Sequence, residues 1–237
     1  KLLDEIVNMG AAADVKVTPL IRYDDDVITG ISNVIKEYNI TDLMIGIDQQ
    51  KGFSSSFVYN LRTGYLNNNT ANIFLYHAAQ PVSTVQRYFV ILPNKASKEP
   101  QFFQSLLKVW NIARNSGSKI EFYGSETTIE TIEKIKKKVN IDADFIIFNN
   151  WDELTKVFDK MKDNDALILF MAHQSMVSYL PQMRRVPNYL NQHFRQRNFL
   201  LVFPAYQNES DYNKDVRDIA NADDFVEIRK IVGRLFK

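Results

Sequence analysis

The sequence contains no cysteine. This absence excludes disulfide scaffolds, thiolate metal sites and cysteine nucleophiles, and it agrees with a reducing compartment. No apolar run approaches the roughly 18–20 residues that a membrane-spanning helix requires. The opening residues Lys1–Val7 have the pattern of an amphipathic helix and lack the layout of a signal peptide. We therefore expect a cytoplasmic location, with no insertion of this segment into a membrane.

An excess of charge of either sign is also missing. The chain has 29 Lys and Arg against 28 Asp and Glu, a net charge of +1, so no global field attracts nucleic acid or an anionic membrane. The densest run, Lys134–Lys138, lies beside Glu130 and Glu133 at helical spacing, which is typical of a solvated helix face. We expect no nucleic-acid partner.

Apolar residues make up 45% of the chain and charged residues 24%, as in ordinary globular proteins. Eight runs are rich in Ile, Val, Leu and Phe and do not alternate cleanly with polar residues, which is typical of strands covered by helices on both faces. The predicted strands are Val15–Arg22, Asp42–Ile47, Asn72–His77, Tyr88–Leu92, Lys119–Tyr123, Asp144–Phe148, Ala166–Phe170 and Asn198–Phe203.

Helical patterns fall between these strands. The predicted helices lie near residues 1–10, 26–38, 55–67, 99–115, 127–139, 151–162 and 177–194. Regular alternation of strand and helix predicts an α/β fold with a doubly wound, mainly parallel, Rossmann-like sheet.

A repeat relates the two parts of the chain. Each part has a helix, a strand and a second helix, then an apolar strand that begins with Asp, a longer helix and a strand that begins with Asn. The last two strands begin 30 residues apart at Asp42 and Asn72, and 33 residues apart at Asp165 and Asn198. We therefore predict two halves, residues 1–86 and 87–205, followed by a polar segment and C-terminal helix over 206–237.

The first half lacks a counterpart of residues 87–124, which supply a strand, a helix and a further strand in the second half. We expect about 40 residues of a longer parent chain to supply this counterpart; the alternative is pairing with a partner chain. Near the other end, Phe225–Phe236 has apolar residues at helical spacing behind the capping candidates Asp223 and Asp224. This helix is expected to pack on the chain's own sheet, with a dimer or partner contact as the alternative.

The strands Asp42-Leu-Met-Ile-Gly and Asn72-Ile-Phe-Leu-Tyr, in this order of elements, resemble the universal stress protein family. The resemblance implies an adenine nucleotide alpha hydrolase-like fold, with residues 1–79 similar to the last two thirds of such a domain and 87–205 similar to a complete, divergent one. Tandem domains of this kind occur as free cytoplasmic proteins. They also occur as the cytoplasmic C-terminal region of bacterial sodium/proton (cation/proton) antiporters.

Nucleotide-binding members of that family carry a glycine-rich phosphate loop after the fourth strand. Here Gly46 matches its first glycine, but Gln49 stands where the next is expected, and 170–179 contains no glycine. Glycines matter because they let backbone amides approach phosphate closely. The fingerprint is therefore broken in both halves, and an adenine nucleotide is a possible ligand rather than an expected cofactor. The remaining candidate ligand residues are Asp48, Lys51, Gly52, Ser54, Ser55 and Ser56, with Asn94 and His173 in the second half.

Candidate catalytic groups are few. His77, His173 and His193 lie far apart and have no metal-ligand spacing, although the first two follow strands, where ligands bind in open α/β sheets. The simpler interpretation is that local hydrogen bonds satisfy them. The run 24–26 of three aspartates lacks the pattern of a calcium loop and is interpreted as a charge cluster at a helix N-terminus. We expect no enzyme and no metal.

Three functions remain open. The first is a non-catalytic regulatory or sensing domain, in the setting of a bacterial cation/proton antiporter, with the transmembrane part of the same polypeptide as its partner. The second is a free-standing tandem stress protein that binds ATP or another adenine nucleotide through the loop from Gly46 to Ser56. The third is a dimerisation module in which Asn72–His77 and Asn198–Phe203 pair with a second copy, since a homodimer is expected from the family.

Overall fold

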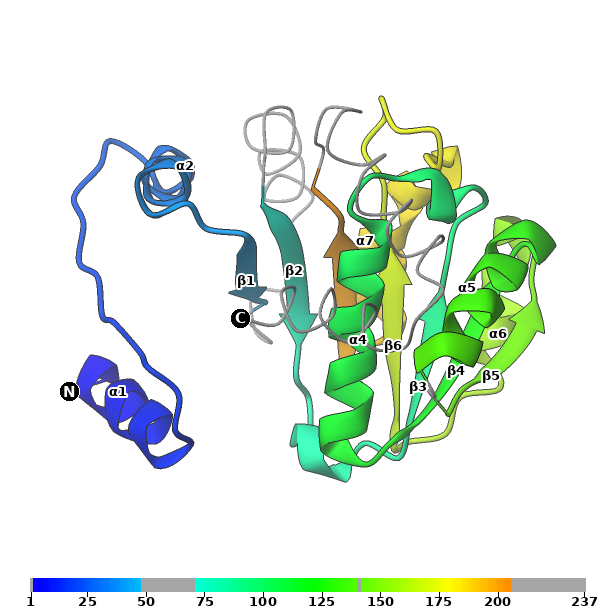
Figure 1. Ribbon diagram of the computed structural model, residues 1–237, viewed down its shortest axis with the longest axis horizontal. Coiled ribbons are helices and arrows are strands. Elements are labelled where there is room, and N and C mark those ends of the chain that lie inside the picture. Colours follow the sequence, from blue (N-terminus) through cyan, green and yellow to red (C-terminus); the bar gives the residue numbers. More distant parts are fainter. Residues whose placement is uncertain (1, 48–70, 140–141, 206–237) are drawn as a thin grey trace. The chain divides into compact units, whose positions relative to one another are not determined.

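A computed structural model describes residues 2–47, 71–139 and 142–205 of this chain. The chain divides into two compact units, residues 1–39 and 40–237, and each is described here by itself. The described part of the second unit contains the sheet and every described tryptophan (Figure 1). No helix in the described ranges is long and apolar enough to cross a membrane.

The first unit consists of two helices, α1 (Leu2–Ala12) and α2 (Val27–Tyr38), joined by an irregular segment. Asp26 is the N-cap of α2, where its Oδ1 accepts hydrogen bonds from the amides of Ile28 at 2.8 Å and Thr29 at 3.0 Å. At the other end Asn39 adopts the left-handed conformation that ends the helix. The interpretation of the three aspartates as a helix N-terminal cluster is therefore confirmed.

The predicted strand Val15–Arg22 is wrong, because these residues form an extended segment without a ladder. No described residue of the first unit forms a strand that could pair with it, and β-prone residues become a strand only through hydrogen bonds to a neighbour. The apolar side chains of Val15 and Ile21 consequently stay exposed, with 57% and 72% of their surface accessible.

The second unit contains one seven-stranded sheet in the order β1-β2-β7-β6-β3-β4-β5 (Figure 1). All neighbouring strands are parallel except β2 and β7, which are antiparallel. The strands β1 and β2 therefore run opposite to the other five. The strands are β1 (Asp42–Gly46), β2 (Asn72–His77), β3 (Arg87–Ile91), β4 (Lys119–Gly124), β5 (Asp144–Ile147), β6 (Asp165–Phe170) and β7 (Phe199–Phe203).

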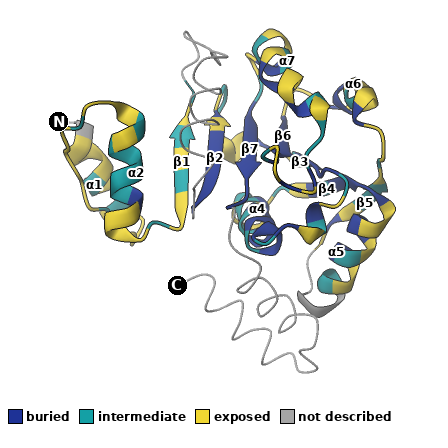
Figure 2. Cartoon of the chain, turned by 90° about the horizontal axis from the view of Figure 1, so that it is seen from above, coloured by how far each residue is buried: buried dark blue, intermediate teal, exposed yellow. Residues whose placement is uncertain are grey.

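Helices cover both faces of this sheet, with α4 and α5 on one side of the row of strands and α6 and α7 on the other (Figure 2). These helices are α4 (Phe102–Ser116), α5 (Glu126–Val139), α6 (Leu154–Phe158) and α7 (Val186–His193), with short 3₁₀ turns at η3 (Val82–Thr84), η4 (Ala96–Lys98), η5 (Trp151–Glu153) and η6 (Pro181–Arg185). The predicted helix near 177–194 thus begins later and divides into a 3₁₀ turn and an α-helix. The predicted helix near 55–67 lies outside the described residues.

Alternating strand residues supply the two cores. Tyr88 and Val90 of β3 join Leu106 and Trp110 of α4 in one buried cluster, while Phe89 points to the opposite face. The aromatic residues of α4, Phe102, Phe103 and Trp110, are therefore core residues. The α/β class and the mainly parallel sheet are confirmed.

Arg87 ties the amino ends of three neighbouring strands together. Its guanidinium lies 2.6 Å from Asp165 Oδ2 of β6 and 2.8 Å from Glu121 Oε1 of β4, and over the ring of Phe89 at 4.4 Å. The hydrogen bond to Asp165, followed by that to Glu121, raises the pKa of Arg87. The Asp165 side chain is 4% exposed, so its charge depends on Arg87 and on the amide of Lys162 at 2.7 Å.

The strands β2 and β7 of the same chain pair with each other in antiparallel fashion. Leu75 lies opposite Leu201, and both strands are interior strands with a neighbour on each side. Pairing of these two strands with a second copy, as the dimerisation hypothesis requires, is therefore wrong, because each already uses both hydrogen-bonding edges. A homodimer through another surface stays a prediction.

Candidate ligand site at the strand ends

From β3 the chain continues to β4 and β5 on one side of that strand and then crosses to β6 and β7 on its other side. The strand order therefore reverses between β3 and β6, which are parallel neighbours, and we call this place the reversal point. In open α/β sheets, ligands bind in the crevice at the carboxyl ends of such strands. Asn94 follows β3 and His173 follows β6, so the topology brings these two predicted residues to the ends of neighbouring strands. The ends of these two strands form the candidate ligand site.

Asn94 is half-buried in the turn that leads from β3 to η4. Its Nδ2 donates a long hydrogen bond of 3.4 Å to the carbonyl of Asn149, which follows β5. Its Oδ1 is buried and has no hydrogen-bond partner among the described residues. A buried acceptor without a donor costs free energy, and a ligand N–H group would satisfy it.

Several backbone amides of the loop after β6 already donate hydrogen bonds within the protein. The amide of Ala172 donates to Met183 Sδ and that of His173 to Met176 Sδ, both at 3.3 Å. His173 Nδ1 accepts from the amide of Ser175 at 3.3 Å and lies 2.8 Å from its hydroxyl oxygen. A phosphate loop needs free amides, whereas the amides of Ala172, His173 and Ser175 already have partners within the loop or in η6.

Glu99 closes the same loop from the opposite side of the reversal point. Its Oε1 accepts hydrogen bonds from the amide of Ser178 at 2.8 Å and from the hydroxyl of Ser178 at 2.5 Å, and both residues are buried. We call this contact the Glu99–Ser178 latch. The sequence did not predict this contact, because a glutamate before a helix is usually a solvated N-terminal residue. Nothing local in the sequence indicates its distant partner.

Gly46 is the last residue of β1, which runs opposite to β3 and β6. Gly46 therefore lies at the end of the sheet where β3 and β6 begin, whereas Asn94 and His173 follow the end where these two strands finish. The structure therefore does not bring Gly46 together with those two residues. A Cβ atom at position 46 would lie 3.0 Å from Tyr76 Oη, so a side chain here must displace the Tyr76 ring. The candidates Asp48, Lys51, Gly52, Ser54, Ser55 and Ser56 lie outside the described residues.

The described histidines have local partners. His77 is buried, stacks on Phe199 with ring centroids 5.2 Å apart, and its Nε2 donates to the carbonyl of Arg195 at 3.0 Å. His193 lies against the ring of Tyr189 at 4.5 Å. Within the described ranges, no group of three or more His, Asp or Glu side chains has the geometry to hold a metal ion.

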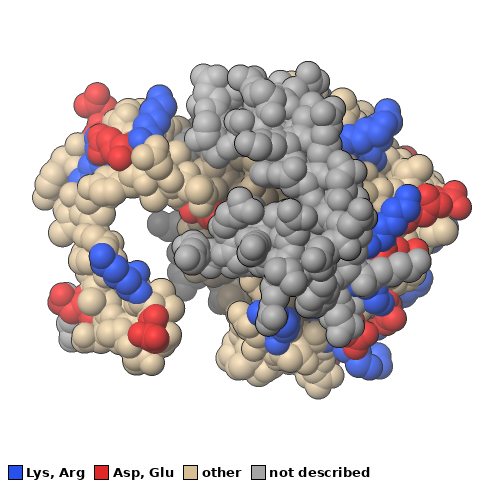
Figure 3. Space-filling model, in the orientation of Figure 1, with Lys and Arg blue, Asp and Glu red and all other residues tan. Residues whose placement is uncertain are grey.

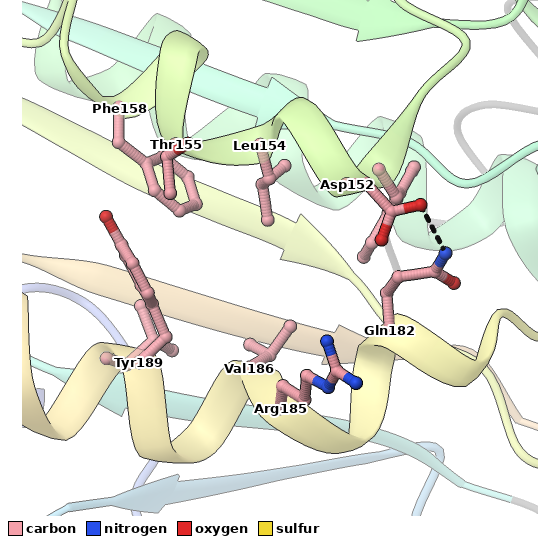
Figure 4. A pocket seen from close by; sticks show the side chains of 10 residues that line it. Asp152, Leu154, Thr155, Phe158, Gln182, Arg185, Val186 and Tyr189 are labelled. Carbon is pink, nitrogen blue, oxygen red and sulfur yellow. Dashed lines mark hydrogen bonds between the residues drawn. The ribbon is translucent and has the colours of Figure 1, made fainter.

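A second hollow lies between α6 and α7 on the other face of the sheet (Figure 4). Its volume is about 140 Å³, and apolar side chains line it from both helices, among them Leu154 and Phe158 of α6 and Val186 of α7 (Figure 4). At its rim Gln182 Nε2 donates to Asp152 Oδ2 at 3.0 Å, and Arg185 lies beside them. This hollow is small and largely apolar, and the sequence analysis did not predict it.

Charges of both signs are interspersed over the described part of the surface that Figure 3 shows. No single-sign patch gathers on this part of the face. The distribution agrees with the net charge of +1.

No protein-family model matches the sequence, and no curated protein sequence matches it. Among solved structures, the chain is similar to the crystal structure of a universal stress protein from Archaeoglobus fulgidus DSM 4304. The identity is 11%, the TM-score is 0.56, and the match covers 88% of this chain and 76% of that one. The fold is therefore an α/β fold of the universal stress protein type. An identity this low shows the fold and nothing of ligand or activity.

Proposed function

We propose that this chain is a non-catalytic cytoplasmic regulatory or sensing module made of two universal-stress-protein-like halves. The relation between β2 and β7 supports the two halves. Asn72 Oδ1 accepts from the amide of Ala205 at 2.9 Å, and Asn198 Oδ1 accepts from the amide of Ala79 at 2.7 Å. The two asparagines and the two alanines are each 126 positions apart, so the repeat maps one contact onto the other.

The closed loop after β6 is the single observation that carries the non-catalytic proposal. Four of its amides donate to methionine sulfurs, His173 and Glu99, which leaves these four unavailable to a phosphate. A buried carboxylate beside the crevice also disfavours a phosphate there, because like charges repel strongly where water is excluded. In this proposal, the second half serves as a rigid body that transmits changes in packing and turns over no substrate.

The mechanism that we propose is a shift of population between two arrangements of the halves. A ligand or partner that binds one arrangement more tightly displaces the equilibrium by its difference in affinity. The antiparallel seam β2–β7 supports such coupling, since it joins strands from both halves into one sheet. The family resemblance suggests the partner that responds to this change, the transmembrane part of a bacterial cation/proton antiporter in the same polypeptide. In this proposal, the shift in population alters the transport rate of that part.

A specific observation favours a second candidate, the binding of an adenine nucleotide by a free-standing protein. Asn94 Oδ1 is buried and unpaired at the reversal point, and it would accept an N–H such as that of an amino-substituted ring. In this case the base occupies the second-half crevice, while the phosphates lie away from the Glu99–Ser178 latch.

Native mass spectrometry of the purified chain separates the two candidates. Co-purified nucleotide, lost in Asn94→Ala but retained in the matched exposed variant Asn149→Ala, would establish nucleotide binding at the second-half crevice. Loss in a Gly52→Ala, Ser54→Ala double variant would place binding in the first half. A mass without adduct, together with no binding of added ATP by calorimetry, is the result that the phosphate-independent regulatory module predicts.

The antiporter setting has its own test. The parent gene is expected to encode apolar membrane spans ahead of this segment, and deletion of residues 40–237 from that transporter should change the pH or ion dependence of transport in vesicles. A parent gene without such spans would end the antiporter proposal and leave the sensing module as a free protein.

A further inference from the structure

A local two-fold axis relates β2 to β7, but the described helices that cover the two strands are not related by it. We call two residues or segments that lie 126 positions apart in the two strands, or that correspond in the repeat, mates. Leu75 lies opposite Leu201, and the repeat interval of 126 positions relates Phe74 to Leu200 and Tyr76 to Val202. Phe74 and Val202 both belong to the buried cluster under α4. The residues that this interval relates to them, Leu200 and Tyr76, line an open groove of about 280 Å³ on the same face of the sheet. Leu200 still belongs to the buried cluster, whereas Tyr76 does not.

The groove lies where a mate of α4 would lie. Ser105 of α4 donates a hydrogen bond of 3.2 Å to Asn72 Oδ1, and Asn198, the mate of Asn72, lines the groove. Exposure follows the same asymmetry, since Val202 is fully buried and Tyr76 is 40% exposed. No described helix of the second unit covers the Tyr76 side of the seam. The lining is almost wholly apolar, with Met44 of β1 at one wall and Ile112 of α4 at the other.

The outer edge of β1 is open in the described sheet. The amide of Ile47 donates to β2, and the carbonyl of Thr41 accepts from β2, so the odd-numbered residues of β1 face that strand. Backbone groups alternate along a strand, and those of Met44 and Gly46 therefore point to the open edge. The equivalent edge of β6 pairs in parallel with β3 over its length.

We propose that the open edge of β1 and the Tyr76 groove form one docking surface for a strand–helix–strand segment of the same polypeptide. Its first strand pairs in parallel with β1 as β3 pairs with β6. Its helix lies in the groove as α4 lies over Phe74 and Val202. The segment is the mate of Arg87–Gly124, and the inference rests on the two-half architecture proposed above.

The chemistry of the surface defines this occupant. A strand that joins β1 must offer apolar side chains on both faces, and its helix must carry an apolar stripe that meets Tyr76, Leu200 and Met44. A second copy of the chain has no such element to donate, because β3 and β4 are interior strands of its own sheet and α4 is buried against them. In residues 87–147 this unit leads directly into α5 and β5. The repeat therefore joins its mate to the amino end of α1, the counterpart of α5.

Hydrogen exchange at β1 tests the proposal. Residue-resolved exchange is measured on the 237-residue chain and on the longer polypeptide that carries the natural residues ahead of it. The amides of Met44 and Gly46 should exchange at least about tenfold more slowly in the longer polypeptide, because each gains a ladder partner. The amides of Leu43 and Ile45, which face β2, serve as internal references and should change less.

Two proline variants of the longer polypeptide sharpen the test. Met44→Pro removes a donor at the open edge and leaves the bonds to β2 intact, so it should abolish the added protection of Gly46. Ile147→Pro is the matched control at the other edge of the sheet, where Phe148 donates to β4 and Ile147 points outward. It should leave the protection of β1 unchanged.

Unchanged exchange at Met44 and Gly46 in the longer polypeptide would overturn the proposal. So would protection that already exists in the 237-residue chain and rises with protein concentration, since that pattern indicates a second copy. Failure of the sensing function is distinguishable, because a protected β1 with no bound ligand and no effect on transport would leave the docking surface in place.

Discussion

Asn72 is the first residue of β2 and Asn198 immediately precedes β7, and the side chain of each accepts a hydrogen bond from the amide two residues beyond the end of the opposite strand. Asn198 makes three hydrogen bonds, to the amides of Ala79 and Gln80 and to the carbonyl of Gln80, and it is 6% exposed. Asn72 is 2% exposed and bonds to Ala205, Ser105 and Asp42. The seam is thus held at both ends by buried amides as well as by its ladder.

The first prediction concerns these two side chains. Asn198→Ala and Asn72→Ala should each lower the free energy of unfolding of the second unit by about 2–4 kcal/mol, because each leaves several buried partners without hydrogen bonds. Urea unfolding followed by tryptophan fluorescence reports this unit, since Trp110 and Trp151, the only tryptophans, are buried in it. The exposed Asn149→Ala is the control and should change stability by less than about 0.5 kcal/mol. Equal effects of all three variants would contradict the prediction.

Arg87→Met should destabilise the second unit by about 2–4 kcal/mol. The change leaves Asp165 buried and without its cation, and the value falls below that of a fully buried pair because the Arg87 side chain is 24% exposed. Adding Asp165→Asn should recover part of the loss, and a double-mutant cycle in urea measures the coupling. The exposed pair Lys156–Glu153 gives the comparison, where Lys156→Ala should cost under about 1 kcal/mol. A loss from Arg87→Met no larger than that from Lys156→Ala would refute a structural role for the pair.

The third prediction is that the Glu99–Ser178 latch holds the loop after β6. Ser178→Ala removes the hydroxyl donor to Glu99 and leaves the buried carboxylate with the Ser178 amide, so it should cost about 1–3 kcal/mol. Hydrogen exchange should rise over residues 171–178 before it rises in the strands. Gln174→Ala, at an exposed position of the same loop, is the control. Faster exchange of equal size in both variants would show that the latch is not what holds the loop.

The fourth prediction is a pH dependence in α2. The hydroxyl and amide of Thr29, with the amide of Ile28, lower the pKa of Asp26, and the hydrogen bond from Arg22 lowers that of Asp24. A carboxylate with a lowered pKa in the folded state stabilises it above the ordinary value near 3.8, and this stabilisation is lost as the pH falls through the lower folded value.

Amide protection factors of α2, corrected for intrinsic exchange, should therefore be constant from about pH 6 to pH 5 and fall below about pH 4. Asp26→Ala should show lower protection at pH 6 and a weaker fall toward acid. If α2 in Asp26→Ala kept the protection and the pH dependence of the unchanged protein, the cap would have no role in holding the helix.

The sequence predicted the described strands of the second unit closely, because all of them are short apolar runs and five of the seven, β2, β3, β4, β6 and β7, are mostly buried. It failed at Val15–Arg22 for the same reason, since an apolar, β-branched run indicates a strand whether or not a partner is present. Helix ends near α6 and α7 were also misplaced. There, 3₁₀ turns replace the first helical turns, and the apolar spacing does not distinguish the two.

The sequence likewise predicted some residues near the candidate site and not others. Asn94 was predicted as a ligand residue from the family resemblance and His173 from its place after a strand, and the parallel pairing of β3 and β6 brings the ends of their strands together. Glu99 and Ser178 were not found, because they lie 79 positions apart and neither has an unusual local pattern. Gly46 was assigned to the same kind of loop as His173, but the antiparallel direction of β1 places it at the other edge of the sheet.

By itself the sequence determined the α/β class, the order of the strands and helices, and the loss of the phosphate-loop glycines, because these depend on local composition and on spacing along the chain. Only the tertiary structure decided that β2 pairs with β7 in opposite directions, that Glu99 closes the loop after β6, and that β1 keeps an open edge. Those features depend on which distant segments meet, and hydrogen-bond partners across a sheet leave no periodic signal in the residues that form them.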